Sequence, residues 1–390
     1  MKKFINYGKQ SIQGVDKKQV LKTLSSELLT TGPEVKKFEK KFSNYVKAKY
    51  SISCSNGTVA LYLAFRAIGL KKNDIIIIPS INFIAAANMA SLLRANIYLA
   101  DVDPLTGQMT PETLKRCIEK NKLKKIKAIC TMYNGGNPLH AKEFFLISRK
   151  KKSYLIEDAC HALGGKYLRN NEIKVGSCKY SDISTFSFHP VKPITSGEGG
   201  MISTNSNAIK KKIMLLRNHG IVKKSNLYKN NWSYDVVDHG FNFRLSDIHA
   251  SLGSSQLKYL NFFIKKRNNI AKAYNMFLKK NKFINIKNNF FFNTYSGWHL
   301  YVAHINFKKL KITKEKLIQA LYKKKIIVQV HYIPTFLFKK FKKLKRSENF
   351  IGANQYFNSA LSLPIYPDLK LREVKKIIFI LNKILNDNAK

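Results

Sequence analysis

Acidic residues are scarce in this chain. Its 390 residues include 23 Asp and Glu against 70 Lys and Arg, so the formal net charge is +47. Such a charge permits binding to nucleic acid or to an anionic membrane. The basic residues, however, are spread along the chain in short runs, and no aromatic-basic RNA-binding signature accompanies them. We therefore interpret the lysines as solvent-exposed surface residues and expect no specific nucleic-acid partner.

Cysteine is also rare, and the chain has no CxxC pair. The odd count of five excludes a fully paired disulfide scaffold, and the missing CxxC argues against a zinc site. The N-terminal residues MKKFINYGKQSIQ contain lysines but no apolar segment of a signal peptide. Together these features favour a reduced, cytoplasmic protein without a bound metal.

No uninterrupted apolar run is long enough to span a membrane. The most apolar stretch, IIIIPSINFIAAANMASLL at 75–93, is broken by Pro79, Ser80, Asn82 and Asn88. A strand, a turn and a helix explain this stretch better than a membrane span does. We therefore expect no membrane partner.

What the chain does contain is an alternation of short strand-like runs with helical patterns over its first 250 residues. Strand-like examples are YSISCS, ANIYLADVD, IKAICTMYN, SYLIEDA, ISTFSF and GGMISTN. This alternation predicts an α/β domain with a mostly parallel sheet, covered on both faces, at residues 1–255. A long helical stretch then leads into strands (HLYVAHINF, IIVQVHYIP) and helices, which predict a smaller α+β domain at 256–390.

Ligands of open parallel sheets bind beyond the carboxyl ends of the strands, so residues there are the first site candidates. SNGTVAL at 55–61 follows a strand and opens a helix at about Thr58, with Gly57 in the turn. The helix start and the Thr hydroxyl suit an anion. Taken alone, the same residues are explained better by an N-cap without any ligand.

Two further clusters carry ionisable groups. IEDACHALGG at 156–165 ends an apolar run with Glu157 and Asp158, and Asp158 could hold a protonated heterocyclic nitrogen; His161 follows. HGFNFRLSDIHASLG at 239–253 places Asn242 and Arg244 on an extended segment, and Arg suits phosphate or carboxylate. The alternatives are a surface acid in a turn and a helix-capping loop with an exposed Arg.

The stretch SFHPVKPITSGEGG at 187–200 places Lys192 between two prolines. Pro190 and Pro193 remove backbone donors, and Pro193 disfavours a helical conformation at Lys192. We expect Lys192 on a rigid, extended loop at the carboxyl edge of the sheet. A partly desolvated lysine there can be a nucleophile toward a carbonyl. A surface lysine in a Pro/Gly loop is the alternative.

The order and spacing of these clusters resemble the nucleotide-sugar aminotransferase family of fold type I pyridoxal-phosphate (PLP) enzymes. The resemblance covers nearly the whole chain, including LLTTGPEVKKFEKKFSNYV, PSINFIAAANMA, SFHPVKPITSGEGG, LRNHG, IIVQVHYIP and ALSLPIYPDL. Within the family, FHPVKPITSGEGG and QVHYIP resemble the transaminases of pseudaminic acid biosynthesis. These use L-glutamate to aminate C4 of a UDP-linked 4-keto-6-deoxy sugar.

The resemblance implies a role for each site residue. Lys192 would bind PLP covalently and then act as acid and base, and Asp158 would pair with the pyridine nitrogen. His161 would lie beside the ring near its phenolic oxygen. The other implied contacts are to the cofactor phosphate from Gly57, Thr58, Ser187 and the partner subunit's Asn242, to the ring from Phe83, and to substrate from Arg244 of the partner subunit, His331 and Tyr332.

The resemblance also implies a homodimer with shared active sites, 2-oxoglutarate as the second product, and a nucleotide-linked keto sugar as acceptor. Dehydrating relatives have histidine in place of the lysine, so Lys192 favours transamination, and Cys160 stands where relatives usually have Ala or Ser. Two alternatives remain: amination of another UDP-, GDP- or dTDP-linked sugar, and a non-catalytic regulator with the PLP fold.

Overall fold

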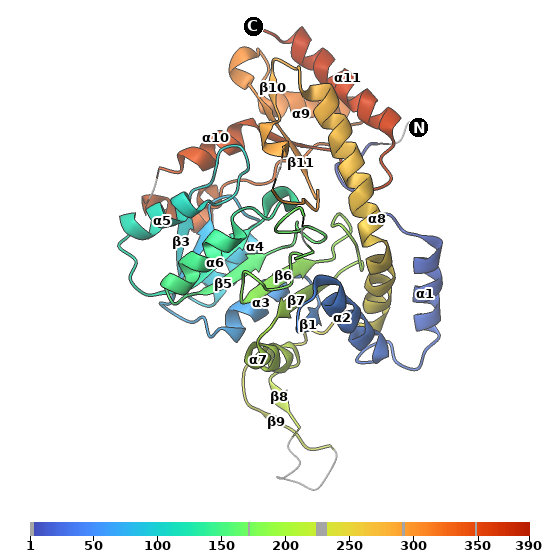
Figure 1. Ribbon diagram of the computed structural model, residues 1–390, viewed down its shortest axis with the longest axis vertical. Helices are drawn as coiled ribbons and strands as arrows, with labels where there is room; N and C mark the ends of the chain where they lie inside the picture. Colours follow the sequence, from blue (N-terminus) through green and yellow to red (C-terminus); the bar gives the residue numbers. More distant parts are fainter. Residues whose placement is uncertain (1–3, 171, 224–231, 291–292, 348) are drawn as a thin grey trace.

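The computed structural model describes residues 4–170, 172–223, 232–290, 293–347 and 349–390, and it is dominated by one seven-stranded sheet (Figure 1). The strand order is β1-β7-β6-β5-β4-β2-β3, and β7 alone runs antiparallel to its neighbours. The strands are β1 (Tyr50–Cys54), β2 (Ile75–Pro79), β3 (Asn96–Ala100), β4 (Ile126–Met132), β5 (Tyr154–Asp158), β6 (Ile183–Ser187) and β7 (Gly200–Thr204). The predicted α/β fold with a mostly parallel sheet is confirmed.

Helices bury both faces of this sheet. Ile76 and Ile78 of β2 pack into the core beneath α3 and α4, whereas Ile77 between them packs into the core beneath α5 and α6. Because successive strand residues face opposite sides, burial of both faces requires an unbroken apolar run such as IIII. The helices of the large part before α8 (Asp247–Leu278) are α1 (Gly14–Leu24), α2 (Pro33–Val46), α3 (Gly57–Ala67), α4 (Ala85–Leu92), α5 (Pro111–Lys120), α6 (Ala141–Lys150) and α7 (Asn207–Arg217), of which α1 packs on α8 rather than on the sheet.

The long helix α8 (Asp247–Leu278) runs from this large part into a smaller C-terminal part (Figure 1). There β10 (Ile284–Asn285), β11 (Tyr301–Ile305) and β12 (Ala360–Leu363) form an antiparallel sheet beside α9 (Lys314–Lys323), α10 (Ile351–Ser359) and α11 (Leu371–Asp387). The C-terminal α+β part is thus confirmed. The boundary after residue 255 falls inside α8 and stays a prediction.

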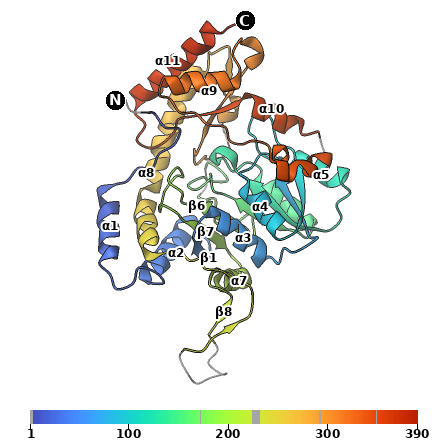
Figure 2. The same ribbon diagram turned by 180° about the vertical axis from the view of Figure 1, so that it is seen from behind.

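Shorter elements connect these parts. The strands β8 (Ile221–Val222) and β9 (Asp235–Val236) form a small antiparallel pair that projects from the large part beyond α7 (Figures 1 and 2). The 3-10 helices are η1 (Asn134–Gly136), η2 (Lys287–Asn289), η3 (Phe307–Lys309), η4 (Thr335–Leu337) and η5 (Lys339–Ser347). In the described part of the chain, no helix combines the length and apolarity needed to cross a membrane.

One predicted strand is wrong. The segment IIVQVHYIP forms only isolated bridges, from Ile326 to Ile5 and from Gln329 to Ser362. It leaves the small sheet after these single pairs, because the next residues turn to the large part, where the Tyr332 hydroxyl meets His161 at 2.9 Å.

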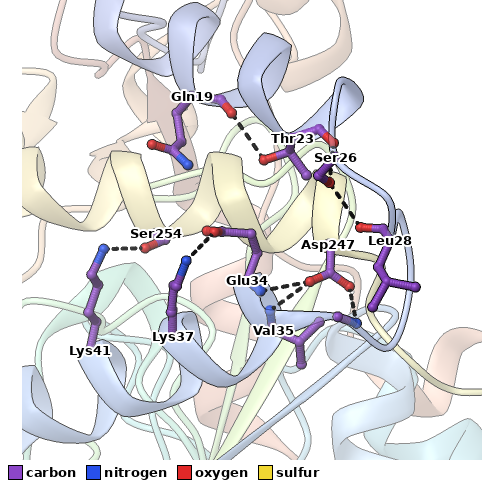
Figure 3. A network of polar contacts seen from close by, with 11 residues as sticks. Gln19, Thr23, Ser26, Leu28, Glu34, Val35, Lys37, Lys41, Asp247 and Ser254 are labelled. Atoms are coloured by element: carbon purple, nitrogen blue, oxygen red, sulfur yellow. Dashed lines mark hydrogen bonds and ion pairs between the residues drawn. The ribbon is translucent and has the colours of Figure 1, made fainter.

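The start of α8 is anchored by a buried carboxylate (Figure 3). Asp247 accepts hydrogen bonds from the N–H groups of Gly32 (2.7 Å), Glu34 (2.7 Å) and Val35 (3.3 Å) at the start of α2. The unpaired N–H groups and the dipole of a helix N-terminus stabilise a carboxylate in this position. This contact joins α2 to α8 and fixes the end of the segment that carries Asn242 and Arg244.

Candidate active site

A cavity of about 810 Å³ opens where the carboxyl ends of β5 and β6 meet the first turn of α3 and the segment 329–332 of the small part. Nine of the eleven predicted site residues line it: Gly57, Thr58, Phe83, Asp158, His161, Ser187, Lys192, His331 and Tyr332. Residues far apart in sequence are therefore brought to one place, as expected for strand ends of a parallel sheet.

The floor of the cavity at the start of α3 is an anion cup. Asn56 caps the helix by accepting from the Val59 N–H at 2.9 Å. A Cβ at Gly57 would lie only 2.8 Å from the Cβ of Ser187, so glycine is required for Ser187 to approach the helix start. The helix dipole and the hydroxyls of Thr58 and Ser187 together suit a phosphate group.

Lys192 lies in a turn rather than on the extended loop that the sequence led us to expect. Its backbone N–H donates to the His189 carbonyl at 2.9 Å, and the loop closes where the Phe188 N–H donates to the Gly199 carbonyl at 2.8 Å. Burial lowers the pKa of the Lys192 ammonium, and Cys160 and Asp158 partly oppose this shift. The amine is thus held outside any helix and is more easily deprotonated than a surface lysine.

Asp158 ends β5 and is only 3% exposed. One carboxylate oxygen accepts from the Cys160 N–H at 3.2 Å. Burial raises the pKa of this carboxyl, while the hydrogen bonds of Cys160 and the charge of Lys192 lower it. A cationic ring nitrogen bound in the cavity would stabilise the carboxylate further.

His161 packs against the small part as well as the large one. Its Nε2 lies 2.9 Å from the Tyr332 hydroxyl, its Nδ1 lies 3.4 Å from the Gly135 N–H, and its ring centroid is 4.2 Å from that of His299. Burial and the nearby Lys192 and His331 hold the pKa of His161 well below its usual range. The imidazole is therefore neutral at physiological pH.

The opposite wall is aromatic. The Phe83 ring centroid lies 5.7 Å from that of Tyr332, and Phe83 is 51% exposed. His331 is held by a 2.9 Å contact between its Nδ1 and the Ser362 hydroxyl, and burial with the charge of Lys192 lowers its pKa to about 3. A flat ring could enter between this wall and Asp158.

Asn242 and Arg244 do not line the cavity of their own chain. Asn242 forms an isolated bridge with Asn218, whose side-chain oxygen accepts from Arg244 at 2.5 Å. The segment lies against the cup, because the Ser55 N–H donates to the Phe243 carbonyl at 3.0 Å. The role of both side chains in a partner's site stays a prediction.

The cavity also contains residues that sequence reasoning missed, among them Tyr7, Glu198, His299 and Gln329. Glu198 lies within SFHPVKPITSGEGG and Gln329 lies within IIVQVHYIP, so both could have been proposed as site residues from the sequence. Tyr7 gives no such signal, since it reaches the cavity through tertiary bonds such as that from the Ile365 N–H to its carbonyl, 3.0 Å.

Residues 10–382 match the model of the DegT/DnrJ/EryC1/StrS aminotransferase family. The chain belongs to this family. It is 36% identical over 384 residues, 98% of this chain and 97% of the relative, to a UDP-4-amino-4,6-dideoxy-N-acetyl-beta-L-altrosamine transaminase of Campylobacter jejuni. Membership of the DegT/DnrJ/EryC1/StrS family makes it a PLP-dependent nucleotide-sugar aminotransferase.

Two solved structures of sugar aminotransferases share the fold over nearly the whole length. Helicobacter pylori PseC, described as an aminotransferase of pseudaminic acid biosynthesis, aligns with a TM-score of 0.90 and 29% identity, covering 99% of this chain and 100% of that one. The PLP-form of the putative sugar aminotransferase Spr1654 from Streptococcus pneumoniae aligns with a TM-score of 0.88 and 25% identity, covering 98% of this chain and 99% of that one.

The cavity of this family member fits PLP in three respects. It has a glycine-floored cup for a phosphate, a buried carboxylate with room for a cationic ring nitrogen, and a half-buried lysine with a lowered pKa. When bound, PLP supplies an electrophilic carbonyl for amines and an electron sink for a carbanion.

Proposed function

We propose that the enzyme transfers the amino group of L-glutamate to C4 of a UDP-linked 4-keto-6-deoxy sugar, forming UDP-4-amino-4,6-dideoxy-N-acetyl-β-L-altrosamine. The observation that carries this proposal is the 36% identity, over nearly both whole chains, to the Campylobacter jejuni transaminase of that name. Lys192 in the cavity supports it, because transamination needs an amine base where dehydrating relatives have histidine.

Each residue of the cavity takes a role in this reaction. Lys192 would hold the cofactor covalently at rest. Once released, its amine would act as the base that takes the proton from the donor's α-carbon and as the acid that delivers this proton again. Asp158 keeps the pyridine nitrogen protonated. Gly57, Thr58 and Ser187 bind the phosphate.

The walls of the cavity orient the reactants. Phe83 packs on the cofactor ring, and His161 lies beside it as a neutral imidazole. His331 and Tyr332 of the small part face the substrate. Because these groups come from two parts of the chain, ligand binding and exclusion of water depend on how the parts meet.

A homodimer completes the site. Asn242 of the partner subunit binds the cofactor phosphate, and Arg244 of the partner subunit binds the donor carboxylate or the phosphates of the sugar nucleotide. This assignment is supported by the position of both residues outside the cavity of their own chain.

A panel of nucleotide sugars tests the proposed function. Purified enzyme with PLP and L-glutamate is given UDP-, GDP- and dTDP-linked 4-keto-6-deoxy sugars, and the products are measured by mass. We expect amination of the UDP-linked N-acetyl sugar at the highest kcat/KM, with 2-oxoglutarate formed in equal amount. Preferred amination of a GDP- or dTDP-linked sugar would assign the enzyme to another branch of the same family.

A further inference from the structure

We propose that Tyr332 is a hydrogen-bond donor of fixed direction, whose hydroxyl proton is directed at the carbonyl oxygen of the keto sugar because His161 occupies its acceptor side. Tyr332 would thereby polarise the carbonyl that receives the amine. This inference rests on the proposed function, since it names a further catalytic residue in the same cavity.

The direction of the hydrogen bond follows from the tautomer of His161. The Gly135 backbone N–H donates to Nδ1 at 3.4 Å, and an N–H can donate only to a ring nitrogen without a proton. The neutral ring must then carry its proton on Nε2. That Nε2–H group faces the Tyr332 hydroxyl oxygen at 2.9 Å and donates to it.

A second tether holds the same two segments together. The Asn134 side-chain N–H donates to the Tyr356 hydroxyl at 2.8 Å, and that hydroxyl donates to the His331 carbonyl at 2.9 Å. Asn134 and Gly135 both belong to the turn η1 after β4. The segment that carries Tyr332 is therefore joined to η1 by two chains of hydrogen bonds. One runs through Tyr356 to His331, and the other runs through His161 to Tyr332.

The turn can approach His161 this closely only without a side chain. At Gly136, φ is +106°, and a Cβ there would lie 2.5 Å from the His161 carbonyl oxygen. Any other residue would push η1 away and lengthen the bond to Nδ1. Gly136 therefore serves the orientation of His161.

The phenolic proton of Tyr332 is left without an acceptor. Because its oxygen accepts from His161, the proton points elsewhere, and in the described part of the chain this hydroxyl has no second partner. Tyr332 lines the cavity together with Lys192. Burial raises the pKa of this phenol well above its usual range, so the proton is retained.

The substrate is better placed than the cofactor to accept the hydrogen bond from the Tyr332 hydroxyl. The groups that fit PLP, at Gly57, Asp158, Ser187 and Lys192, all come from the large part, whereas Tyr332 belongs to a wall formed by Gln329, Val330 and His331 of the small part. A molecule that enters over the cofactor meets this wall. A hydrogen bond to its carbonyl oxygen stabilises the negative charge that develops there when the amine attacks, and no covalent bond to Tyr332 forms.

The tautomer is tested without substrate or cofactor. Solid-state NMR of cofactor-free protein labelled with [15N]histidine resolves protonated from bare ring nitrogens, and His161→Gln identifies the His161 signals among the nine histidines. We expect a neutral ring at pH 7, protonated at Nε2. A ring protonated at Nδ1, or at both nitrogens, overturns the proposal.

The role in catalysis is tested by the two half-reactions of Tyr332→Phe. Loss of one donor to a developing oxyanion lowers the rate by about 10²–10³-fold. We expect this loss in the half-reaction with whichever keto sugar of the panel is aminated, and a loss at least ~10-fold smaller in the glutamate half-reaction. Tyr322→Phe, on the exposed side of α9, is the matched control.

Other outcomes are decisive in the opposite direction. Equal losses in both half-reactions, or weakened binding of PLP by Tyr332→Phe, would mean that the acceptor is an oxygen of the cofactor or that the role is structural. If no sugar of the panel is aminated, the proposed function fails, and the NMR experiment still decides whether the hydroxyl is oriented.

Discussion

Two adjacent carboxylates at the end of β5 have opposite surroundings. Glu157 is fully buried on one face of the sheet and accepts hydrogen bonds from four hydroxyl groups, those of Tyr133, Tyr167, Ser181 and Ser184. Asp158, on the other face, lines the cavity and accepts from the Cys160 N–H. Strand alternation alone sends these neighbours to opposite faces.

The difference separates a structural from a functional acid. Burial raises the pKa of both carboxyls, but at Glu157 four hydroxyl groups oppose the shift, whereas at Asp158 it is opposed by Cys160 and by Lys192 across the cavity. Glu157 has its partners within the fold. Asp158 retains unused acceptor capacity, which a bound cation can use.

The largest expected effect is at the lysine that faces Asp158. Lys192→Arg keeps the charge but removes the primary amine, so turnover should fall by at least ~10⁴-fold. The absorbance of lysine-bound cofactor should disappear as well. Lys314→Arg is a matched control, since Lys314 is a half-buried lysine whose pKa is lowered to about 8 but which lies outside the cavity. Full turnover by Lys192→Arg would refute the assignment.

Asp158→Asn should have the next largest effect. Removing one partner of a buried charge pair costs about 3–5 kcal/mol, which corresponds to a fall in kcat/KM of roughly 10²–10⁴-fold. Stability toward urea should change much less in the cofactor-free protein, because the Cys160 N–H keeps an acceptor in the Asn side-chain oxygen. An Asp158→Asn variant that unfolds readily but turns over normally would show that Asp158 serves stability rather than catalysis.

Glu157→Gln should show the opposite pattern. Its amide group places a donor among four hydroxyl donors, so the free energy of unfolding should fall by about 1–3 kcal/mol, measured by urea denaturation. The folded enzyme should keep kcat within ~3-fold, since Glu157 does not line the cavity. Loss of kcat in fully folded Glu157→Gln would show that both acids serve catalysis.

The smallest expected effect is on the pH dependence of the free energy of unfolding. The folded-state pKa of Glu157 is raised, so the folded state binds its proton more tightly than the unfolded state does. Its contribution to stability is complete below the usual pKa near 4.5 and is lost as pH rises through the folded-state pKa. The stability of the wild type relative to Glu157→Gln should therefore decline as pH is raised from 4.5. A difference that grows with pH would mean that the hydroxyl network lowers this pKa.

Several features of the site could be predicted because they depend on local chemistry. A glycine before a helix, an acid at a strand end and a lysine between prolines can each be found in the chain, and the alternation of elements places them at one sheet edge. The turn at Lys192 and the missing strand in IIVQVHYIP could not be predicted, since backbone bonds to His189 and single bridges to Ile5 and Ser362 determine them.

The parallel sheet and the spacing of Gly57, Asp158 and Lys192 could be derived from the amino-acid sequence alone, because periodicity and turn chemistry act over a few residues. The positions of Tyr7 and His299 in the same cavity, and that of Glu157 outside it, became known only from the three-dimensional structure. Those positions depend on contacts between segments far apart in the chain, where hydrogen bonds such as that between His161 and Tyr332 join the large part to the small one.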